Sequence, residues 1–304
     1  MHLKQLVLQL SVIIVNYNVK YFTEQCLYTV INASKNITAE IIVIDNNSTD
    51  GSRHFFAGKF PTVQFTWNID NIGFATANNM ALKKAKGEYI LFLNPDTIIP
   101  VDCLEKCMTV FKTKDIIGGL GVHMVDGNGN FLKESKRGFP SLSTSFYKLI
   151  GLAALFPKSK IFAKYYLGNL DENKSHEIDV LCGAFMMHPK KVLDITGGFD
   201  ESFFMYGEDI DLSYRIQKAG YINYYFAETT IIHFKGESTR TRDLNYVKHF
   251  YGAMSIFVQK HYSGKGSFFF NAIIHAAIWC RAIPLVIASL FKKIFSKKSQ
   301  SKKM

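Results

Sequence analysis

Runs of apolar residues that alternate with helical patterns constrain the fold more than any other feature of the sequence. The runs that have the length and β-branched composition of buried strands are residues 10–16, 40–45, 62–68 and 88–94. Residues 21–33 and 75–87 lie between them and have the apolar spacing of helices. Strands that are apolar throughout are typical of a sheet covered on both faces. The pattern therefore predicts an α/β fold around a mostly parallel central sheet.

Polar segments rich in Asn and Asp follow each of these strands. They are residues 16–18, 45–50, 68–73 and 94–96. The carboxyl ends of parallel strands lie at one edge of a sheet, and ligands bind at that edge in open α/β folds. We therefore expect these segments to line one pocket for a nucleotide or a sugar.

The net charge of +11 is concentrated near the C-terminal end of the sequence. Ten Lys or Arg residues and no Asp or Glu follow Asp243, so residues 1–243 carry only +1. A nucleic-acid-binding domain would have its basic patch on the folded body, so we expect no nucleic acid as a partner. A basic tail instead favours contact with an anionic membrane surface.

Two apolar segments bear on membrane contact. Residues 268–291 are long enough to span a bilayer, which takes about 20 residues. Polar residues and a proline interrupt this segment: Asn271, His275, Arg281 and Pro284. An interfacial helix is therefore the preferred interpretation, with a spanning helix and a solvated tail as alternatives. Residues 143–166 are apolar and basic with no acid, and they fit either a core segment or an amphipathic surface segment.

The five cysteines include no CxxC pair, so we expect buried free thiols in a reducing compartment. The N-terminal residues lack the small-residue cleavage site of a secretory signal peptide. Together with the basic tail, these features predict a peripheral protein on the cytoplasmic face of the inner or plasma membrane.

Six short motifs occur in order between residues 10 and 240. They are SVIIVNYN, IIVIDNNSTDGS, NIGFATANN, LFLNPDT, GGFDESFFMYGEDIDLSYRIQKAGY and HFKGEST. Together they resemble the family 2 inverting glycosyltransferases, specifically the rhamnosyltransferase-like branch. The resemblance implies a GT-A type fold, with a Rossmann-like nucleotide-binding half at about 1–125 and an acceptor half at about 126–240. Residues 241–304 would then form a helical, membrane-associated region that contains the segment 268–291 and the basic tail.

Sugar transfer from a nucleoside diphosphate requires stabilisation of the leaving group, which a divalent cation usually provides. By resemblance, Asp96 is the last acid of the family's DxD motif and is expected to bind Mg²⁺ or Mn²⁺. Asn94 takes the place of the first acid and would hydrogen-bond the ribose. His233 is by resemblance a second contact to the metal or the diphosphate, and a satisfied core histidine is the alternative. Three further residues would make the loop after His233 face an anion: Lys235, Ser238 and Arg240.

The acceptor hydroxyl must lose a proton to a positioned base. By resemblance to the family's ED motif, Asp209 is that base, and Glu208 is the runner-up and an acceptor contact. Acids in the first turn of a helix also stabilise the helix dipole, which is the structural alternative for both. By resemblance, Gly183 and Ala184 would lie near the acceptor, although Gly183 could also be a packing glycine.

The remaining donor-binding candidates follow the first three strands. By resemblance they are Asn16, Tyr17, Asn18, Asp45, Asn71 and Gly73. Asp45 would hydrogen-bond the base or ribose of the nucleoside, and the first three residues would flank it. Asn71 and Gly73 would let the backbone approach the nucleotide, because glycine has no Cβ to clash. A turn glycine is the alternative for Gly73.

The resemblance and the residues together predict an inverting glycosyltransferase. It would move rhamnose or another hexose from a UDP- or dTDP-sugar to a hydroxyl of a saccharide acceptor, which we expect to be lipid-linked, in cell-surface polysaccharide synthesis. A polyprenyl-phosphate sugar transferase and a non-catalytic sugar-nucleotide-binding protein are the alternatives. The sequence has no Walker A, GxGxxG or GxSxG motif, so other nucleotide enzymes and hydrolases fit less well.

Overall fold

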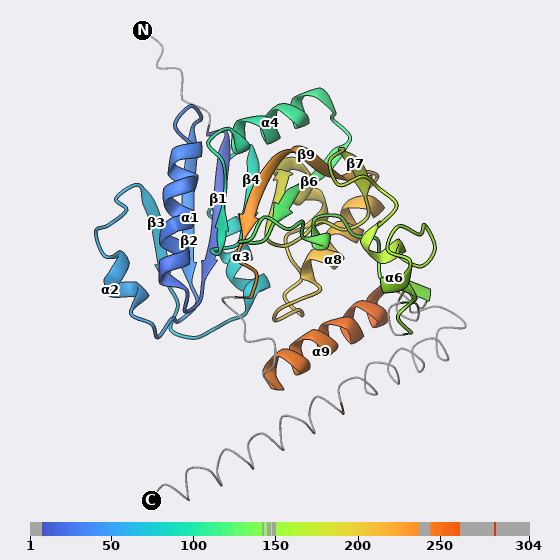
Figure 1. Cartoon of the computed structure of the whole chain (residues 1–304). Coiled ribbons are helices and arrows are strands. Elements are labelled where there is room, and N and C mark those ends of the chain that lie inside the picture. The colour runs from blue at the N-terminus through green and yellow to red at the C-terminus, as the bar shows by residue number, and fades with distance from the viewer. Residues whose placement is uncertain are drawn as a thin grey trace, which may run out of the picture. The chain divides into compact units, whose positions relative to one another are not determined.

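The computed structural model describes residues 8–141, 143–144, 147, 150–236, 244–261 and 283 (Figure 1). The chain divides into two compact units. One consists of residues 1–201 and 208–238, and the other of residues 202–207 and 239–304. The described part of the second unit includes helix α9 (Leu244–His261), and the ring of His249 on this helix stacks on Phe204 at 4.5 Å between centroids.

A mixed nine-stranded sheet forms the centre of the first unit, counted over its described residues. Its strands are β1 (Leu10–Asn16), β2 (Ala39–Asp45), β3 (Val63–Trp67), β4 (Tyr89–Leu93), β5 (Thr97–Ile98), β6 (Ile117–Val125), β7 (His176–Ile178), β8 (Phe185–Pro189) and β9 (Ile222–His233). Their order is β3-β2-β1-β4-β8-β6-β9-β5, and β7 also pairs with β9. The helices of this unit are α1 (Lys20–Ala33), α2 (Ser52–Phe56), α3 (Phe74–Leu82), α4 (Cys103–Thr113), α6 (Leu152–Leu155), α7 (Lys190–Thr196) and α8 (Glu208–Lys218), with 3₁₀ turns η1 (Lys133–Ser135) and η2 (Lys164–Tyr166).

The prediction of a mostly parallel sheet holds for β3, β2, β1 and β4, which are parallel neighbours. It also holds for β6 and β9, which form a parallel pair. It fails for β8, which runs antiparallel to β4 and β6, and for β5 and β7, which run antiparallel to β9, so the sheet is mixed. The direction of β8 depends on a long connection from β4, and neither apolarity nor length of a strand encodes that direction.

Two other strand predictions need correction. The sequences YINYYFA (residues 221–227) and TIIHF (residues 230–234) each have strand character and predict two strands. The structure has one strand instead, β9, with a register shift between Phe226 and Thr230. Glu228 and Thr229 make the sequence look interrupted at that irregularity. Residues 178–188 are expected as one strand, yet β8 begins only at Phe185, and the preceding loop leaves the sheet to reach the site described below.

Apolar side chains cover both faces of the sheet, as the unbroken apolar strands predict. Val12 and Ile14 of β1 pack in one core with α1 and α4. Ile13 and Val15 of the same strand pack in a second core with α3, α7 and α8. Helix α1 lies across β1 and β2 in Figure 1. This layering leaves the carboxyl ends of β1, β2 and β4 at one edge of the sheet.

The described cysteines are free thiols, of which Cys26, Cys103 and Cys107 are buried, as the sequence predicts. Within the described residues, no helix combines the length and apolarity needed to cross a bilayer. The segment 268–291 lies outside the described residues except for Ile283. Of the two interpretations of residues 143–166, the described part favours the surface segment, because Leu155 and Ile161 are exposed.

Candidate active site

Asp209, the predicted base, lies in the first turn of α8 and faces a buried arginine. Its Oδ2 atom accepts a hydrogen bond from Arg137 Nη2 at 2.5 Å and another from the backbone N–H of Gly183 at 3.2 Å. Gly183, a predicted acceptor contact, is therefore a direct neighbour of the predicted base. A Cβ added at Gly183 would lie 3.7 Å from the Cβ of Asp209, which is an ordinary contact. Packing alone thus does not require a glycine here.

Arg137 is a site residue that sequence reasoning misses. It is 8% exposed, and its Nη2 atom also donates to the carbonyl oxygen of Leu181 at 2.6 Å. Its backbone forms an isolated antiparallel bridge with Val180, which brings it alongside the loop that contains Gly183. Burial alone would lower the pKa of Arg137, but the Asp209 carboxylate raises the pKa well above its ordinary value. The guanidinium therefore stays charged and fixes the orientation of Asp209.

Glu208 differs from Asp209 in its surroundings. It is 6% exposed, and its Oε2 atom has no hydrogen-bond partner among the described residues. Burial, followed by the nearby Asp209 carboxylate, raises the pKa of Glu208 to about 8. Glu208 therefore keeps its proton near neutral pH and can donate a hydrogen bond, whereas a base must accept one. This difference favours Asp209 over Glu208 as the base.

Asp96 and His233, the predicted metal ligands, are brought together by the pairing of β5 with β9. Thr97 is the register partner of His233, and the N–H of Phe234 donates to the carbonyl oxygen of Asp96 at 2.9 Å. Asp96 Oδ1 lies 3.3 Å from His233 Nε2, and both side chains are buried. The two atoms are close enough for an ion pair but lack the geometry of a hydrogen bond, so Asp96 Oδ1 is a buried acceptor without a donor.

This pair fits a divalent cation. Carboxylate oxygen is the preferred ligand of Mg²⁺, and imidazole nitrogen is a common transition-metal ligand. Two neighbouring ligands of an octahedral ion with bonds of about 2.1 Å lie about 3 Å apart, close to the observed separation. The described residues contain no cluster of three or more such ligands, so substrate oxygens and water would complete the coordination. Lys235 forms an ion pair with Glu134, while Ser238 and Arg240 lie outside the described residues.

Asn94 lies between the predicted metal ligands and the predicted acceptor contacts Gly183 and Ala184. It follows the last residue of β4, and its N–H donates to the carbonyl oxygen of Ala184 at 3.0 Å. Its own carbonyl oxygen accepts a hydrogen bond from Thr97 Oγ1 at 2.8 Å. A row of contacts therefore runs from Asp96 past Asn94 and Ala184 to Gly183 and on to Asp209. With Arg137 and His233, the structure thus brings together residues from five separate parts of the sequence.

Asp45 and Asn16 pair at the carboxyl ends of β1 and β2. Asn16 Nδ2 donates to Asp45 Oδ2 at 2.6 Å and to Ser52 Oγ at 2.9 Å, and Asn16 Oδ1 accepts from Thr23 Oγ1 at 2.7 Å. The amide of Asn16 is thus engaged within the protein and holds Asp45 in place. Tyr17 is half-buried, and Asn18 is exposed in a left-handed conformation with φ of 57°.

Asn46, which belongs to the polar segment 45–50 expected at the pocket but is not among the individual candidates, organises the loop after β3. Its side-chain amide donates to Asn71 Oδ1 at 2.9 Å and to the carbonyl oxygen of Gly73 at 3.2 Å. Its side-chain Oδ1 atom accepts hydrogen bonds from Asn68 Nδ2 at 3.1 Å and from the backbone N–H of Ile72 at 3.2 Å. Gly73 has φ of 86°, a conformation that side chains disfavour. Asn71 and Gly73 therefore shape this loop, whatever they contact in a bound state.

The profile of the family described as glycosyl transferase family 2 matches residues 11–194, which is more than half of the chain. The chain belongs to this family. The resemblance inferred from the motifs is thereby confirmed, and the protein is a glycosyltransferase.

Curated relatives place this glycosyltransferase near rhamnosyltransferases. The N-acetylglucosaminyl-diphospho-decaprenol L-rhamnosyltransferase of Mycobacterium tuberculosis is 25% identical over 235 residues, covering 74% of this chain and 76% of the relative. The rhamnosyltransferase WbbL of Escherichia coli K12 is 29% identical over 178 residues, covering 56% of this chain and 63% of the relative. Both names agree with the branch that the motifs indicate.

Solved structures share the fold of this glycosyltransferase. TarS residues 1–349 of S. aureus has a TM-score of 0.54 at 16% identity, covering 89% of this chain and 70% of TarS 1–349. The mannosyltransferase PcManGT of Pyrobaculum calidifontis, in complex with GDP-Man and Mn²⁺, has a TM-score of 0.54 at 19% identity. The match covers 93% of this chain and 74% of the PcManGT chain. These likenesses support the GT-A type α/β fold with a mixed sheet.

Proposed function

We propose that this protein is an inverting glycosyltransferase that moves rhamnose or another hexose from a UDP- or dTDP-sugar to a hydroxyl of a saccharide acceptor. The observation that carries the proposal is the unbroken row of contacts from Asp96 and His233, through Asn94 and Ala184, to Asp209. Sugar transfer needs a group that stabilises the negative charge on the leaving diphosphate, and a base on the other side of the sugar that accepts the proton of the attacking hydroxyl. At one end of the row, Asp96 and His233 would hold a cation for the diphosphate. At the other end, Asp209 would act as the base.

At the donor end, Asp45 would hydrogen-bond the nucleoside, with Asn16, Tyr17 and Asn18 beside it. Asn16 holds the Asp45 carboxylate through a 2.6 Å hydrogen bond, so little reorganisation is needed on binding. Asn71 and Gly73 would bring the backbone close to the nucleotide. Asn94 would face the ribose without adding charge.

Asp96 and His233 would hold a divalent cation, Mg²⁺ or Mn²⁺, against the diphosphate. Such an ion offsets the negative charge that develops on the leaving group. The buried Asp96 Oδ1 without a hydrogen-bond donor supports this role. PcManGT, which has the same fold, was crystallised with GDP-Man and Mn²⁺, and GalNAc-T7 with UDP, GalNAc and Mn²⁺.

At the acceptor end, Asp209 would take the proton of the attacking hydroxyl, with Gly183, Ala184 and Glu208 around it. Asp209 is a carboxylate held by Arg137 and the Gly183 N–H, so its orientation is set before substrate arrives. The protonated Glu208 would donate a hydrogen bond to another acceptor oxygen. Glu208 would thus bind the acceptor, while Asp209 would remove the proton of its hydroxyl.

The acceptor in this proposal is a lipid-linked saccharide at the cytoplasmic face of the inner or plasma membrane, used in cell-surface polysaccharide synthesis. The Mycobacterium tuberculosis relative is named for a diphospho-decaprenol substrate. The basic C-terminal region, with ten Lys or Arg residues after Asp243, supports peripheral attachment to anionic lipid. Residues 1–240 would form the catalytic domain, in donor and acceptor halves, and residues 241–304 the membrane-associated region.

A donor screen tests this function. Thermal unfolding is measured with UDP-, dTDP- and GDP-sugars, each with and without Mn²⁺, because a ligand that binds the folded state raises the melting temperature. We expect stabilisation by a UDP- or dTDP-sugar, and product formation with inversion at the anomeric carbon by NMR. No nucleotide-dependent stabilisation, or retention of configuration, would contradict the proposal.

A further inference from the structure

Large apolar side chains are exposed together in residues 150–164. The exposed fractions are 69% for Leu155, 61% for Ile161, 50% for Ile150 and 47% for Phe156. Single exposed apolar residues are ordinary on soluble proteins, but several within one short segment indicate a contact surface. The surface needs a partner that accepts apolar side chains.

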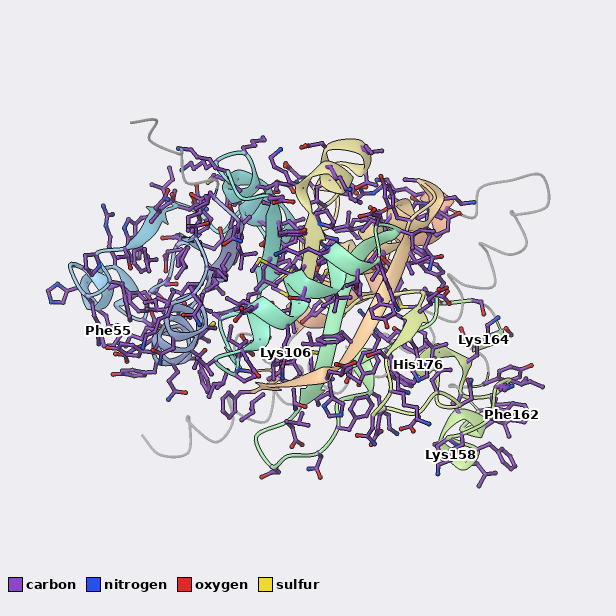
Figure 2. The ribbon with its side chains drawn as sticks, turned by 90° about the horizontal axis from the view of Figure 1, so that it is seen from above. Phe55, Lys106, Lys158, Phe162, Lys164 and His176 are labelled. Atoms are coloured by element: carbon purple, nitrogen blue, oxygen red, sulfur yellow. The ribbon has the colours of Figure 1, made fainter. Side chains whose placement is uncertain are left out.

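The charged residues within this segment have one sign. No Asp or Glu occurs from residue 135 to residue 170, whereas Lys158, Lys160 and Lys164 are exposed among the apolar residues. Lys158, Phe162 and Lys164 lie in one group beyond the sheet in Figure 2. A protein partner would commonly provide acids in discrete places, whereas a bilayer with anionic headgroups matches apolar and basic side chains that alternate. Lysine stems can also lie along apolar surface while the ammonium reaches the headgroups.

The segment is folded, so the exposed side chains are presented in a defined arrangement. The N–H groups of Ala154 and Leu155 donate to the carbonyl oxygen of Gly151 at 3.0 Å, and Ala163 is buried. The ring of Phe162 lies 5.5 Å from the ring of Phe156. Internal contacts therefore fix the backbone of the segment and leave its largest aliphatic side chains outward.

The chain directly after this segment is hydrogen-bonded to the residues on either side of Arg137. The N–H of Gly138 donates to the carbonyl oxygen of Tyr165 at 2.9 Å, and Lys136 Nζ donates to the carbonyl oxygen of Leu167 at 3.0 Å. Arg137, between them, is the residue that holds Asp209. A bilayer against residues 150–164 would thus lie next to the acceptor end of the site.

We propose that residues 150–164 are a membrane-contact surface that places Ile150, Leu155, Phe156 and Ile161 in the interfacial layer of an anionic bilayer. Lys158, Lys160 and Lys164 bind the lipid headgroups. The surface presents the sugar of a lipid-linked acceptor, which lies just outside the bilayer, to Asp209. This inference rests on the proposed function for its acceptor, and it assigns a contact surface separate from the C-terminal region.

Depth of insertion tests the proposal directly in the full chain. An NBD fluorophore is attached to Ile161→Cys and, as a matched control, to Ile195→Cys, which replaces an isoleucine that is 65% exposed on α7. The signal of the labelled unsubstituted chain is subtracted. With vesicles of equal parts phosphatidylcholine and phosphatidylglycerol that contain nitroxide-labelled acyl chains, we expect quenching at position 161 and none at position 195. Absence of quenching at 161, or equal quenching at both positions, would overturn the proposal.

A second measurement separates this proposal from the proposed function. The double variant Leu155→Asp/Ile161→Asp is compared with Ile116→Asp/Ile195→Asp, whose isoleucines are 55% and 65% exposed. We expect the first variant to lose at least tenfold in transfer to a lipid-linked acceptor in vesicles, and to retain transfer to a short soluble acceptor. If the unsubstituted chain transfers sugar to neither acceptor, the proposed function fails, while the quenching result still decides the membrane surface.

A second copy of this chain is the other possible occupant of the surface. Size-exclusion chromatography with light scattering distinguishes it, because the Leu155→Asp/Ile161→Asp variant would then change from dimer to monomer. That change, without quenching at position 161, would assign residues 150–164 to self-association and overturn the membrane proposal.

Discussion

Asp209 and Glu208 are adjacent in the sequence, but their side chains have different partners. Asp209 faces the guanidinium of Arg137 at 2.5 Å, whereas Glu208 Oε2 has no hydrogen-bond donor among the described residues. The motif suggests both acids, and only the three-dimensional surroundings distinguish Asp209 as the proposed base from Glu208 as the proposed hydrogen-bond donor. Arg137 could not be predicted, because it lies far from Asp209 in the sequence and no spacing rule connects them. Asn46 lies in a polar segment expected at the pocket, but its hydrogen bonds to residues 71 and 73 could not be predicted, since those residues follow a different strand.

Replacing Arg137 should affect turnover more than donor binding. In Arg137→Ala, Asp209 loses its orienting partner, so we expect kcat to fall at least tenfold with the KM for the donor nearly unchanged.

Arg137→Lys should recover part of kcat, since it keeps the charge but not the planar geometry. An equal rise in donor KM in both variants, with kcat unchanged, would assign Arg137 to donor binding instead. Steady-state kinetics of both variants provide the measurement.

Replacing Glu208 by Gln should change stability in a pH-dependent way. Burial raises the pKa of Glu208 from 4.5 to about 8, so between these values the folded chain retains a proton that the unfolded chain releases. The contribution of Glu208 to stability therefore falls as pH rises above about 4.5 and levels off above about 8. We expect the free energy of unfolding of Glu208→Gln to equal that of the unsubstituted chain at about pH 4.5. At about pH 8.5 it should be higher by up to about 5 kcal/mol, at roughly 1.4 kcal/mol per pKa unit.

Urea unfolding at several pH values measures this effect. Glu177→Gln, at an exposed glutamate in β7, is the control and should show no such dependence. A stability difference between Glu208→Gln and the unsubstituted chain that is constant with pH would show that Glu208 is ionised in the folded protein.

At the scale of secondary structure, the pairing of β5 with β9 determines the candidate metal site. Strand β5 has only two residues, yet its register places Asp96 beside His233 from a distant part of the sequence. The first strands and helices could be predicted because their apolar patterns are local. The continuity of β9 and the direction of β8 could not, since both depend on pairing with distant strands. The contact between Asp96 and His233 was reached through the family resemblance rather than through any local pattern.

Asp96→Asn should raise the Mn²⁺ concentration needed for half-maximal turnover by at least tenfold. The amide keeps the shape of the side chain but removes the charge that a hard cation prefers. The rise in melting temperature on adding Mn²⁺ with nucleoside diphosphate should shrink in parallel. Asp126→Asn, in the turn after β6, is the control. An unchanged Mn²⁺ dependence in Asp96→Asn would remove Asp96 from the metal site.

At the scale of the whole molecule, the candidate residues of the first unit follow the carboxyl ends of its strands or begin a nearby helix. Asp45 lies at the end of β2, Asp96 follows β4, and Asp209 lies in the first turn of α8, and we propose donor, leaving-group and acceptor functions for them in that order. The α/β layering and the position of this edge followed from the alternating apolar runs. Membership of glycosyl transferase family 2 followed from the ordered motifs. The acceptor side was the less predictable part, because it is assembled from residues 137, 183 and 209.

Asp209→Asn tests the central claim most directly. The change preserves the shape of the side chain and removes its ability to accept a proton, which we expect to lower kcat by about 10²–10⁴-fold. The melting-temperature shift produced by the nucleotide-sugar with Mn²⁺ should remain, and Asp194→Asn, at an exposed aspartate of α7, should retain full turnover. Turnover that persists in Asp209→Asn with donor binding intact would contradict the account and remove Asp209 as the base.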